Sequence, residues 1–148
     1  MTLWQDYLNK NRSRFIRELC DFIRIPSVSA DPGHKDDVVA AAGWVASRLK
    51  VAGAENVSIM PTGGHPCVYG DWLHAGASQP TLLIYGHFDV QPAVPFELWT
   101  TPPFDPDIRD EKVFGRGASD DKGGMLIPIL SFEAMMKTDG KLPVNIKF

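Results

Sequence analysis

The stretch Thr81-Leu82-Leu83-Ile84-Tyr85-Gly86-His87-Phe88-Asp89 decides the fold class of this 148-residue chain. Residues 81–85 form a nearly continuous apolar run, which is typical of a strand buried on both faces by helices. Gly86 ends the run, and an imidazole and a carboxylate follow it at alternate positions. Because alternate residues of an extended chain face the same way, His87 and Asp89 should leave the strand end together.

Helical and extended patterns alternate on either side of this strand. Apolar residues at helical spacing predict a first helix that begins after Thr2 and stops at Ile25-Pro26, because proline disfavours helix at the residue before it. The other elements are expected as helices over residues 35–52, with Gly53 as C-cap, and 122–136, and as strands over residues 56–60, 67–72, 113–114 and 144–148. The alternation predicts an α/β fold: a three-layer αβα sandwich with a mixed, mostly parallel sheet.

Composition excludes several classes of function. A net charge of -3, without a basic stripe interleaved with aromatics, argues against a nucleic-acid-binding module. The N-terminus lacks an apolar stretch of signal-peptide length, and no apolar run is long enough to cross a membrane. Cys20 and Cys67 form no CxxC pair and are expected to be reduced, mostly buried thiols. These features indicate a cytoplasmic protein.

A second polar motif, Gly115-Arg-Gly-Ala-Ser-Asp-Asp-Lys-Gly-Gly124, opens the last predicted helix. Adjacent carboxylates repel each other unless a cation or a helix N-terminus offsets their charge. Asp120 or Asp121 could therefore simply cap the helix. A phosphate cradle is a poorer interpretation, because the motif does not match a P-loop and its acids repel phosphate.

Taken together, the two motifs indicate more than either does alone. One follows a buried strand and the other opens a helix, so both can lie at the same edge of the sheet. A histidine and a carboxylate that meet there suit a borderline metal such as zinc. Asp89 is then expected as the carboxylate that orients the imidazole.

These residues carry a resemblance to a known family. Residues 85–92, YGHFDVQP, then Trp99 to Phe104, then GRGASDDKGG resemble the co-catalytic zinc peptidases, which include carnosinases, aminoacylases, glutamate carboxypeptidases and succinyl-diaminopimelate desuccinylases. Ile25-Pro26-Ser27-Val28-Ser29 also looks like the family's segment after the first helix. The form HFDVQP resembles the dipeptidase branch more than the desuccinylase branch.

The resemblance implies roles for individual residues. His87 would bind one of two divalent metal ions, with zinc first and manganese or cobalt as alternatives. Asp120 would bridge both ions, and Asp89, expected as the catalytic residue, would orient and tune the ligands. Asp121 is expected to be structural, with a cis peptide bond between Asp120 and Asp121. The implied reaction is hydrolysis of dipeptides or N-acyl amino acids by a water activated by the two metals.

The resemblance also implies what residues 1–148 lack. They would form the N-terminal part of the catalytic domain, without the family's Glu-Glu pair, its last two ligands and its lid domain. We therefore expect a fragment of a metallopeptidase that binds metal weakly and is inactive alone. The full-length protein is expected to be a homodimer that acts on a small peptide, whereas the fragment could self-associate through an open sheet edge.

Other interpretations remain open at this stage. The chain could be a non-catalytic α/β module in which His87, Asp89 and Asp120 are only structural hydrogen-bonding groups. Trp99 is expected to pin the proline-rich loop of residues 91–111, and Arg116 to pair with a nearby acid. Convergence of the His87 and Asp120 side chains within the span of one metal ion would favour the metal site.

Overall fold

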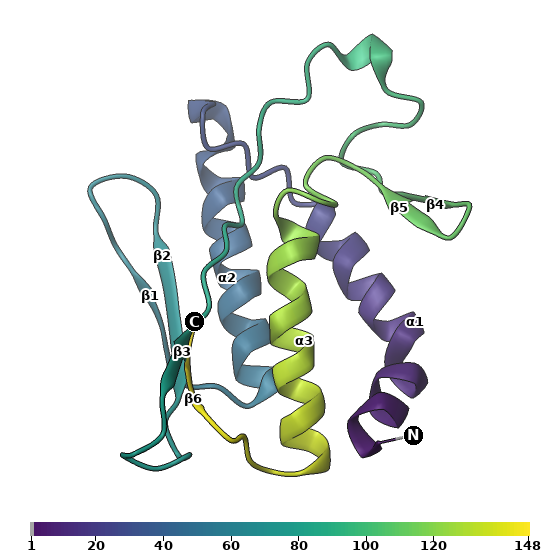
Figure 1. The fold of residues 1–148 in the computed structure, drawn as a ribbon. Helices are drawn as coiled ribbons and strands as arrows, with labels where there is room; N and C mark the ends of the chain where they lie inside the picture. The colour runs from purple at the N-terminus through teal and green to yellow at the C-terminus, as the bar shows by residue number, and fades with distance from the viewer. Residues whose placement is uncertain (1) are drawn as a thin grey trace.

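A computed structural model describes residues 2–148. Three long helices, two short 3₁₀ turns and six strands follow one another along the chain (Figure 1). The helices are α1 (Leu3–Ile23), α2 (Lys35–Ala52) and α3 (Lys122–Thr138), the 3₁₀ turns are η1 (Pro32–His34) and η2 (Phe96–Leu98), and the strands are β1 (Glu55–Met60), β2 (Cys67–Trp72), β3 (Thr81–Leu83), β4 (Asp107–Arg109), β5 (Lys112–Phe114) and β6 (Asn145–Lys147).

The α/β class with a mixed sheet is confirmed, but the sheet is not mostly parallel. The main sheet has the order β1-β2-β6-β3, and only β3 and β6 pair in parallel. β1 pairs with β2, and β2 with β6, in antiparallel fashion. The reason is the connection: a short link joins β1 to β2 as a hairpin, whereas α3 supplies the crossover that a parallel β3–β6 pair requires.

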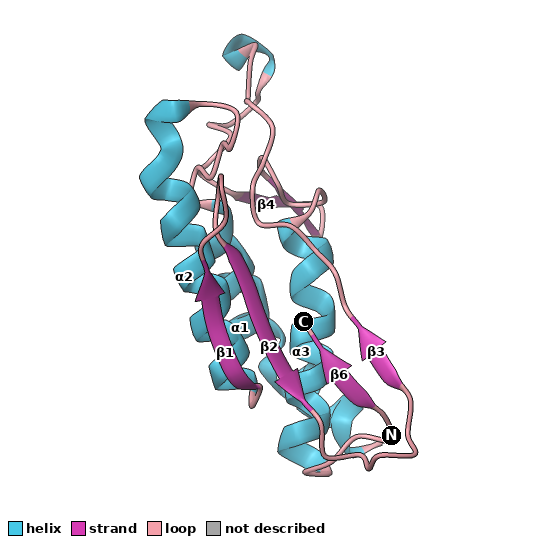
Figure 2. Cartoon of the chain, turned by 90° about the vertical axis from the view of Figure 1, so that its left-hand side faces the viewer, coloured by secondary structure: helices cyan, strands magenta, loops and turns pink. Residues whose placement is uncertain are grey.

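The expected three layers are also not all present among residues 2–148. In Figure 2 the sheet stands in front and all three helices lie behind it, so one face of the sheet has no helix over it. Leu83 and Tyr85, at 71% and 86% exposure, belong to the segment that was expected to be buried on both faces. The continuous apolar run therefore predicted the strand correctly but not its surroundings.

The core lies between the sheet and the helices. Val45 and Leu49 of α2 pack with Phe132 of α3 and Ile146 of β6. Val39, an apolar residue of the same helix, is instead 50% exposed. Phe132 meets Phe148 edge to face, with ring centroids 5.4 Å apart. Apolar burial of this kind stabilises a domain by about 25 cal/mol per Å².

The predicted helix limits are confirmed where specific residues set them. Thr2 precedes α1, and its main-chain N–H donates to Gln5 Oε1 over 2.9 Å. Gly53 follows α2 with φ of 106°, the left-handed conformation that glycine adopts without steric cost. Among residues 2–148, no helix has both the length and the apolar character needed to cross a lipid bilayer.

A cluster of charged side chains ties the three helices together. Glu133 of α3 accepts hydrogen bonds from Arg14 of α1, Arg48 of α2 and the Tyr7 hydroxyl, the last at 2.6 Å. Glu18 of α1 pairs with both arginines. We call these five residues the helix charge cluster. Burial raises the pKa of Glu133, but its hydrogen bonds outweigh burial and lower the pKa overall.

The proline-rich segment is ordered, as expected, and contains an unpredicted strand. β4 pairs with β5 in a separate two-stranded sheet. Trp99 Nε1 donates to the Ala93 carbonyl over 2.8 Å, which pins the loop. Arg116 holds the loop too, but not through an acid: it donates to the Pro92 carbonyl and lies over the Trp99 ring.

The two cysteines are free, as predicted, but only Cys20 is buried, and burial raises the pKa of its thiol. Cys67 is exposed at the start of β2.

Candidate metal centre

The segment after β3 is held in extended form by the residues that follow α1. Val90 N–H donates to the Ser27 carbonyl over 2.9 Å, and the buried Ser27 hydroxyl donates to the Phe88 carbonyl over 2.6 Å. These bonds, together with a parallel bridge between Val28 and Val90, fix the path of residues 87–90. The Ile-Pro-Ser-Val-Ser segment thus positions the histidine of the site.

His87 and Asp120 converge. His87 Nε2 lies 3.0 Å from Asp120 Oδ1, although 33 positions separate the two residues in the chain. One side chain leaves the extended segment after β3, and the other comes just before α3. The expectation that the two motifs meet is confirmed in geometry.

Asp89 orients the imidazole from its other side. His87 Nδ1 lies 3.2 Å from the main-chain carbonyl of Asp89 and 3.2 Å from its Oδ1. The second carboxylate oxygen accepts from the Ser29 hydroxyl. With Nδ1 as the donor to Asp89, Nε2 is the ring nitrogen turned toward Asp120.

The protonation of His87 reflects these neighbours. Partial burial lowers the pKa of its imidazole, but the Asp89 carbonyl, the charge of Asp89, the hydrogen bond to Asp120 and the charge of Asp121 raise it, and the net direction is upward. The site is therefore rich in negative charge and favours a cation beside the ring.

Asp121 has a structural position, as expected. Its Oδ2 accepts from the His87 main-chain N–H over 3.2 Å, and the peptide bond from Asp120 to Asp121 is cis. Asp121 occupies the N-cap of α3, but its side chain makes no capping hydrogen bond. A Cβ on Gly124 would lie 2.1 Å from Asp121 Oδ1, so this glycine leaves the room that the carboxylate needs.

Lys122 is a positioning residue that the sequence analysis missed. Its fully buried ammonium group donates to the carbonyls of Phe22, over 2.9 Å, and of Ile25, at the end of α1. Burial lowers the pKa of Lys122 to about 8. The available signal was Ile25-Pro26, because a helix that stops there leaves carbonyl groups in need of a donor.

The donor atoms fit one metal ion between them. Two tetrahedral zinc ligands at ordinary bond lengths lie roughly 3.4 Å apart, close to the 3.0 Å between His87 Nε2 and Asp120 Oδ1. Asp120 is 82% exposed, so its oxygens are open to a ligand. Within residues 2–148 no group of three or more His, Cys, Asp or Glu side chains is arranged to hold a metal ion.

Comparison with known proteins gives matches to dipeptidases and to succinyl-diaminopimelate desuccinylases. Residues 83–148 match the family described as Peptidase family M20/M25/M40. The Cys-Gly metallodipeptidase DUG1 of Candida albicans is 34% identical over 155 residues, covering 95% of this chain and 32% of that protein. The Beta-Ala-His dipeptidase of Mus musculus is 31% identical over 153 residues, covering 96% of this chain and 31% of that protein.

A solved structure gives the same result. The crystal structure of human carnosine dipeptidase 1 superposes with a TM-score of 0.87 at 29% sequence identity, covering 100% of this chain and 34% of that chain. The chain thus spans about a third of the length of the relatives it matches.

Proposed function

Because the chain belongs to the peptidase family M20/M25/M40, we propose that it supplies metal ligands to a peptidase that hydrolyses dipeptides or related N-acyl amino acids. The observation that carries the proposal is the 3.0 Å approach of His87 Nε2 to Asp120 Oδ1. The names of the relatives, two of which are dipeptidases, support the substrate class.

Each residue of the site has a proposed role. His87 would be a ligand of one divalent ion, and Asp120 would be a ligand shared by that ion and a second one. Asp89 holds the imidazole by its Nδ1–H and increases the basicity of the ligating nitrogen. When bound, the ions activate a water molecule and polarise the scissile carbonyl group. Nitrogen and oxygen donors suit zinc, with manganese and cobalt as alternatives.

The site is proposed to be shared with residues outside the described part. Two ligands hold a divalent ion weakly, because stable zinc sites use three or four protein ligands. We infer that residues 2–148 bind metal weakly and do not turn over substrate alone. We propose that the catalytic base, the other ligands and a lid domain lie outside these residues, since the relatives are about three times as long as this chain.

The proposal extends to partners and location. The full-length protein is a homodimer that acts on a small peptide. It works in the cytoplasm, where thiols stay reduced, which agrees with the two free cysteines. Residues 1–148 alone self-associate through β3, an edge strand with Leu82 and Leu83 exposed. A strictly monomeric species by light scattering at high concentration would count against self-association.

A non-catalytic module is the competing interpretation. It requires His87 and Asp120 to serve only as a structural pair. An Asp120 side chain that is 82% exposed contributes little to stability, because surface pairs are worth about 0–1 kcal/mol. The metal role is therefore favoured.

The test uses the full product of the gene, stripped with a chelator and reloaded with zinc, manganese or cobalt. Hydrolysis of Cys-Gly, β-Ala-His and a panel of N-acyl amino acids is followed by release of the free amino acid. The proposal predicts metal-dependent hydrolysis that His87→Ala abolishes and His74→Ala leaves intact, since His74 lies on the surface beside Glu55. Hydrolysis that persists in His87→Ala would contradict it.

A further inference from the structure

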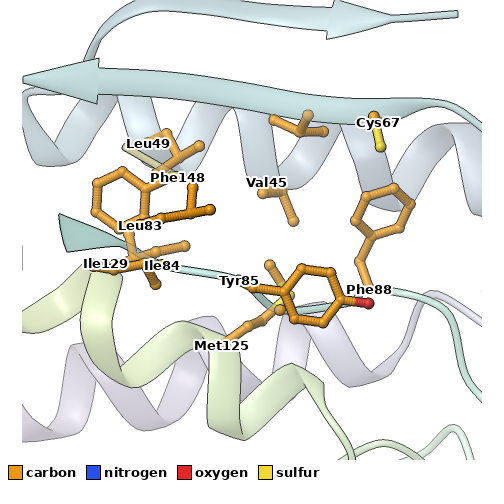
Figure 3. A pocket seen from close by; sticks show the side chains of 12 residues that line it. Val45, Leu49, Cys67, Leu83, Ile84, Tyr85, Phe88, Met125, Ile129 and Phe148 are labelled. Atoms are coloured by element: carbon orange, nitrogen blue, oxygen red, sulfur yellow. The ribbon is translucent and has the colours of Figure 1, made fainter. Parts of the chain in front are cut away.

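The link between β1 and β2, residues 61–66, lies beside the candidate metal centre. In Figure 3 the Phe88 ring points toward Cys67, the first residue of β2, so the start of that strand lies next to the extended segment that follows β3. A cavity of about 250 Å³ is lined by both parts, with His65 from the link and Asp89 from the extended segment. The link is therefore close enough to affect the site.

A hydrogen bond joins the link to the segment that follows α1. His65 Nε2 lies 3.0 Å from the carbonyl oxygen of Ser29, which is 36 positions earlier in the chain. Because a carbonyl oxygen only accepts, Nε2 carries the hydrogen and is the donor. Within the link, the Thr62 hydroxyl donates to the His65 carbonyl over 2.7 Å and accepts from the Gly64 N–H over 3.0 Å. These two bonds hold the link in the shape that brings His65 to Ser29.

Ser29 connects the link to the orienting acid of the site. Its carbonyl accepts from His65, and its hydroxyl donates to Asp89 Oδ2. The other oxygen, Asp89 Oδ1, lies 3.2 Å from His87 Nδ1. One oxygen of the carboxylate is thus held by Ser29, while the other faces the imidazole.

The Asp89 carboxylate depends on such bonds for its orientation. Its side chain is 40% exposed, so packing alone holds it only in part. A carboxylate with a partner on each oxygen has a defined orientation, because rotation of the group weakens both hydrogen bonds. An imidazole whose Nδ1 donates to this carboxylate keeps its Nε2 turned toward Asp120.

We propose that His65 and Ser29 are positioning residues of the candidate metal centre. His65 fixes the main chain of Ser29, whose hydroxyl orients the Asp89 carboxylate against the imidazole. This inference rests on the proposed function, and it gives the β1–β2 link a part in metal binding that the two sequence motifs do not indicate. If the two bonds only stabilised their loops, their removal would change Tm and leave metal affinity unchanged.

The first experiment removes the Ser29 hydroxyl. The full gene product is stripped of metal, and its zinc affinity is measured by competition with a chromophoric chelator, together with the Tm of the metal-free protein. Ser29→Ala is expected to weaken zinc binding about tenfold, the lower end of the range for groups that orient a ligand. Ser29→Thr keeps a hydroxyl donor and stays within about threefold of the wild type. Ser131→Ala is the matched control and binds zinc as the wild type does, because the Ser131 hydroxyl donates to the Ile127 carbonyl of its own helix.

The second experiment tests the link. His65 is exposed, so its replacement is expected to leave the fold intact. His65→Ala removes the donor and weakens zinc binding roughly fivefold, the usual effect of one hydrogen bond. His65→Gln offers an amide N–H in place of Nε2–H and restores most of the affinity. His74→Ala, at another exposed histidine, leaves the affinity unchanged.

A double-mutant cycle shows whether Ser29 acts through Asp89. Asp89→Ala removes the acceptor of the Ser29 hydroxyl, so adding Ser29→Ala to it should weaken zinc binding no further. Losses of affinity that simply add in the double variant would overturn the proposal.

The outcomes separate this inference from the proposed function. Zinc affinity that depends on His87 but on neither Ser29 nor His65 overturns the inference and leaves the proposed function standing. Zinc affinity that is unchanged in His87→Ala overturns both. If Ser29→Ala does not fold, His65→Ala decides: the expected loss of affinity supports the inference, and an affinity equal to that of the wild type overturns it.

Discussion

The helix charge cluster and the candidate metal centre are both built from charged side chains that converge from separate elements, but they differ in what those charges face. In the cluster, Glu133 is 2% exposed in its side chain and receives donors from Tyr7, Arg14 and Arg48. Of the buried side-chain polar atoms of the cluster, only Nη1 of Arg48 lacks a hydrogen-bond partner among the described residues. The charged groups of the cluster therefore neutralise one another.

At the candidate metal centre the balance is different. Asp120 has one contact to His87 and is 82% exposed, while His87 is 38% exposed. Removing a partner from a buried cluster costs stability, whereas removing an exposed ligand costs little stability. The comparison teaches that charged side chains which converge do not by themselves indicate a binding site. A better indication is that they converge while some carboxylate oxygens remain exposed and free to bind a ligand.

The largest expected effect concerns activity. Asp120→Ala in the full gene product should lower kcat/KM for a cleaved dipeptide by at least about 10³-fold, because it removes the proposed bridging ligand. Tm should stay nearly unchanged, since the side chain is exposed. Asp105→Ala, another exposed aspartate, is the matched control. A large decrease in Tm in Asp120→Ala would show that this residue has a structural role, and would contradict the proposed difference between the site and the cluster.

The next effect concerns stability. Glu133→Gln should lower the free energy of unfolding by roughly 3–5 kcal/mol, because the buried Arg48 loses one of its two carboxylate partners and keeps only Glu18. Urea unfolding at neutral pH measures this loss. The exposed Glu97, changed to glutamine, should differ from the wild type by less than about 0.5 kcal/mol. Equal stability of the two variants would show that the cluster contributes nothing.

A smaller effect is expected at the orienting acid. Asp89→Asn keeps the main-chain contact to His87 but removes the negative charge beside Nδ1. Metal affinity of the full gene product, measured by calorimetry, should fall about 10–100-fold, the usual range for a residue that orients a ligand. Unchanged affinity would mean that the Asp89 carbonyl alone orients the ring.

The smallest effect is a pH dependence. The pKa of Glu133 is lowered in the folded protein, so its contribution is present above the unfolded pKa near 4.5 and is lost as pH falls through the lower folded value. Glu133→Gln should therefore show a shallower loss of stability below pH 4.5 than the wild type. Parallel acid profiles for the two proteins would contradict the lowered pKa.

Local signals explain most of what the sequence could predict. Helix limits followed from Thr2, Pro26 and Gly53, and the meeting of His87 with Asp120 followed from the strand end and the helix start. β3 was predicted to reach Tyr85 but ends at Leu83, because its partner β6 covers only Asn145–Lys147. Residues 84–88 stay extended without a partner strand.

Long-range relations could not be predicted in the same way. Arg48 and Glu133 lie 85 positions apart, and each appears in the sequence as an ordinary charge on a helix. The direction of strand pairing and the uncovered face of the sheet depend on connections that periodicity does not encode. Lys122 was overlooked because its partners are carbonyls about a hundred positions away.

The central claim is that one divalent ion lies between His87 and Asp120. Anomalous diffraction at the zinc edge, from crystals of the full gene product soaked in zinc, tests it most directly. We predict a peak within about 2.2 Å of both His87 Nε2 and an Asp120 oxygen. Zinc bound at other residues, with His87 and Asp120 still joined only to each other, would contradict the claim.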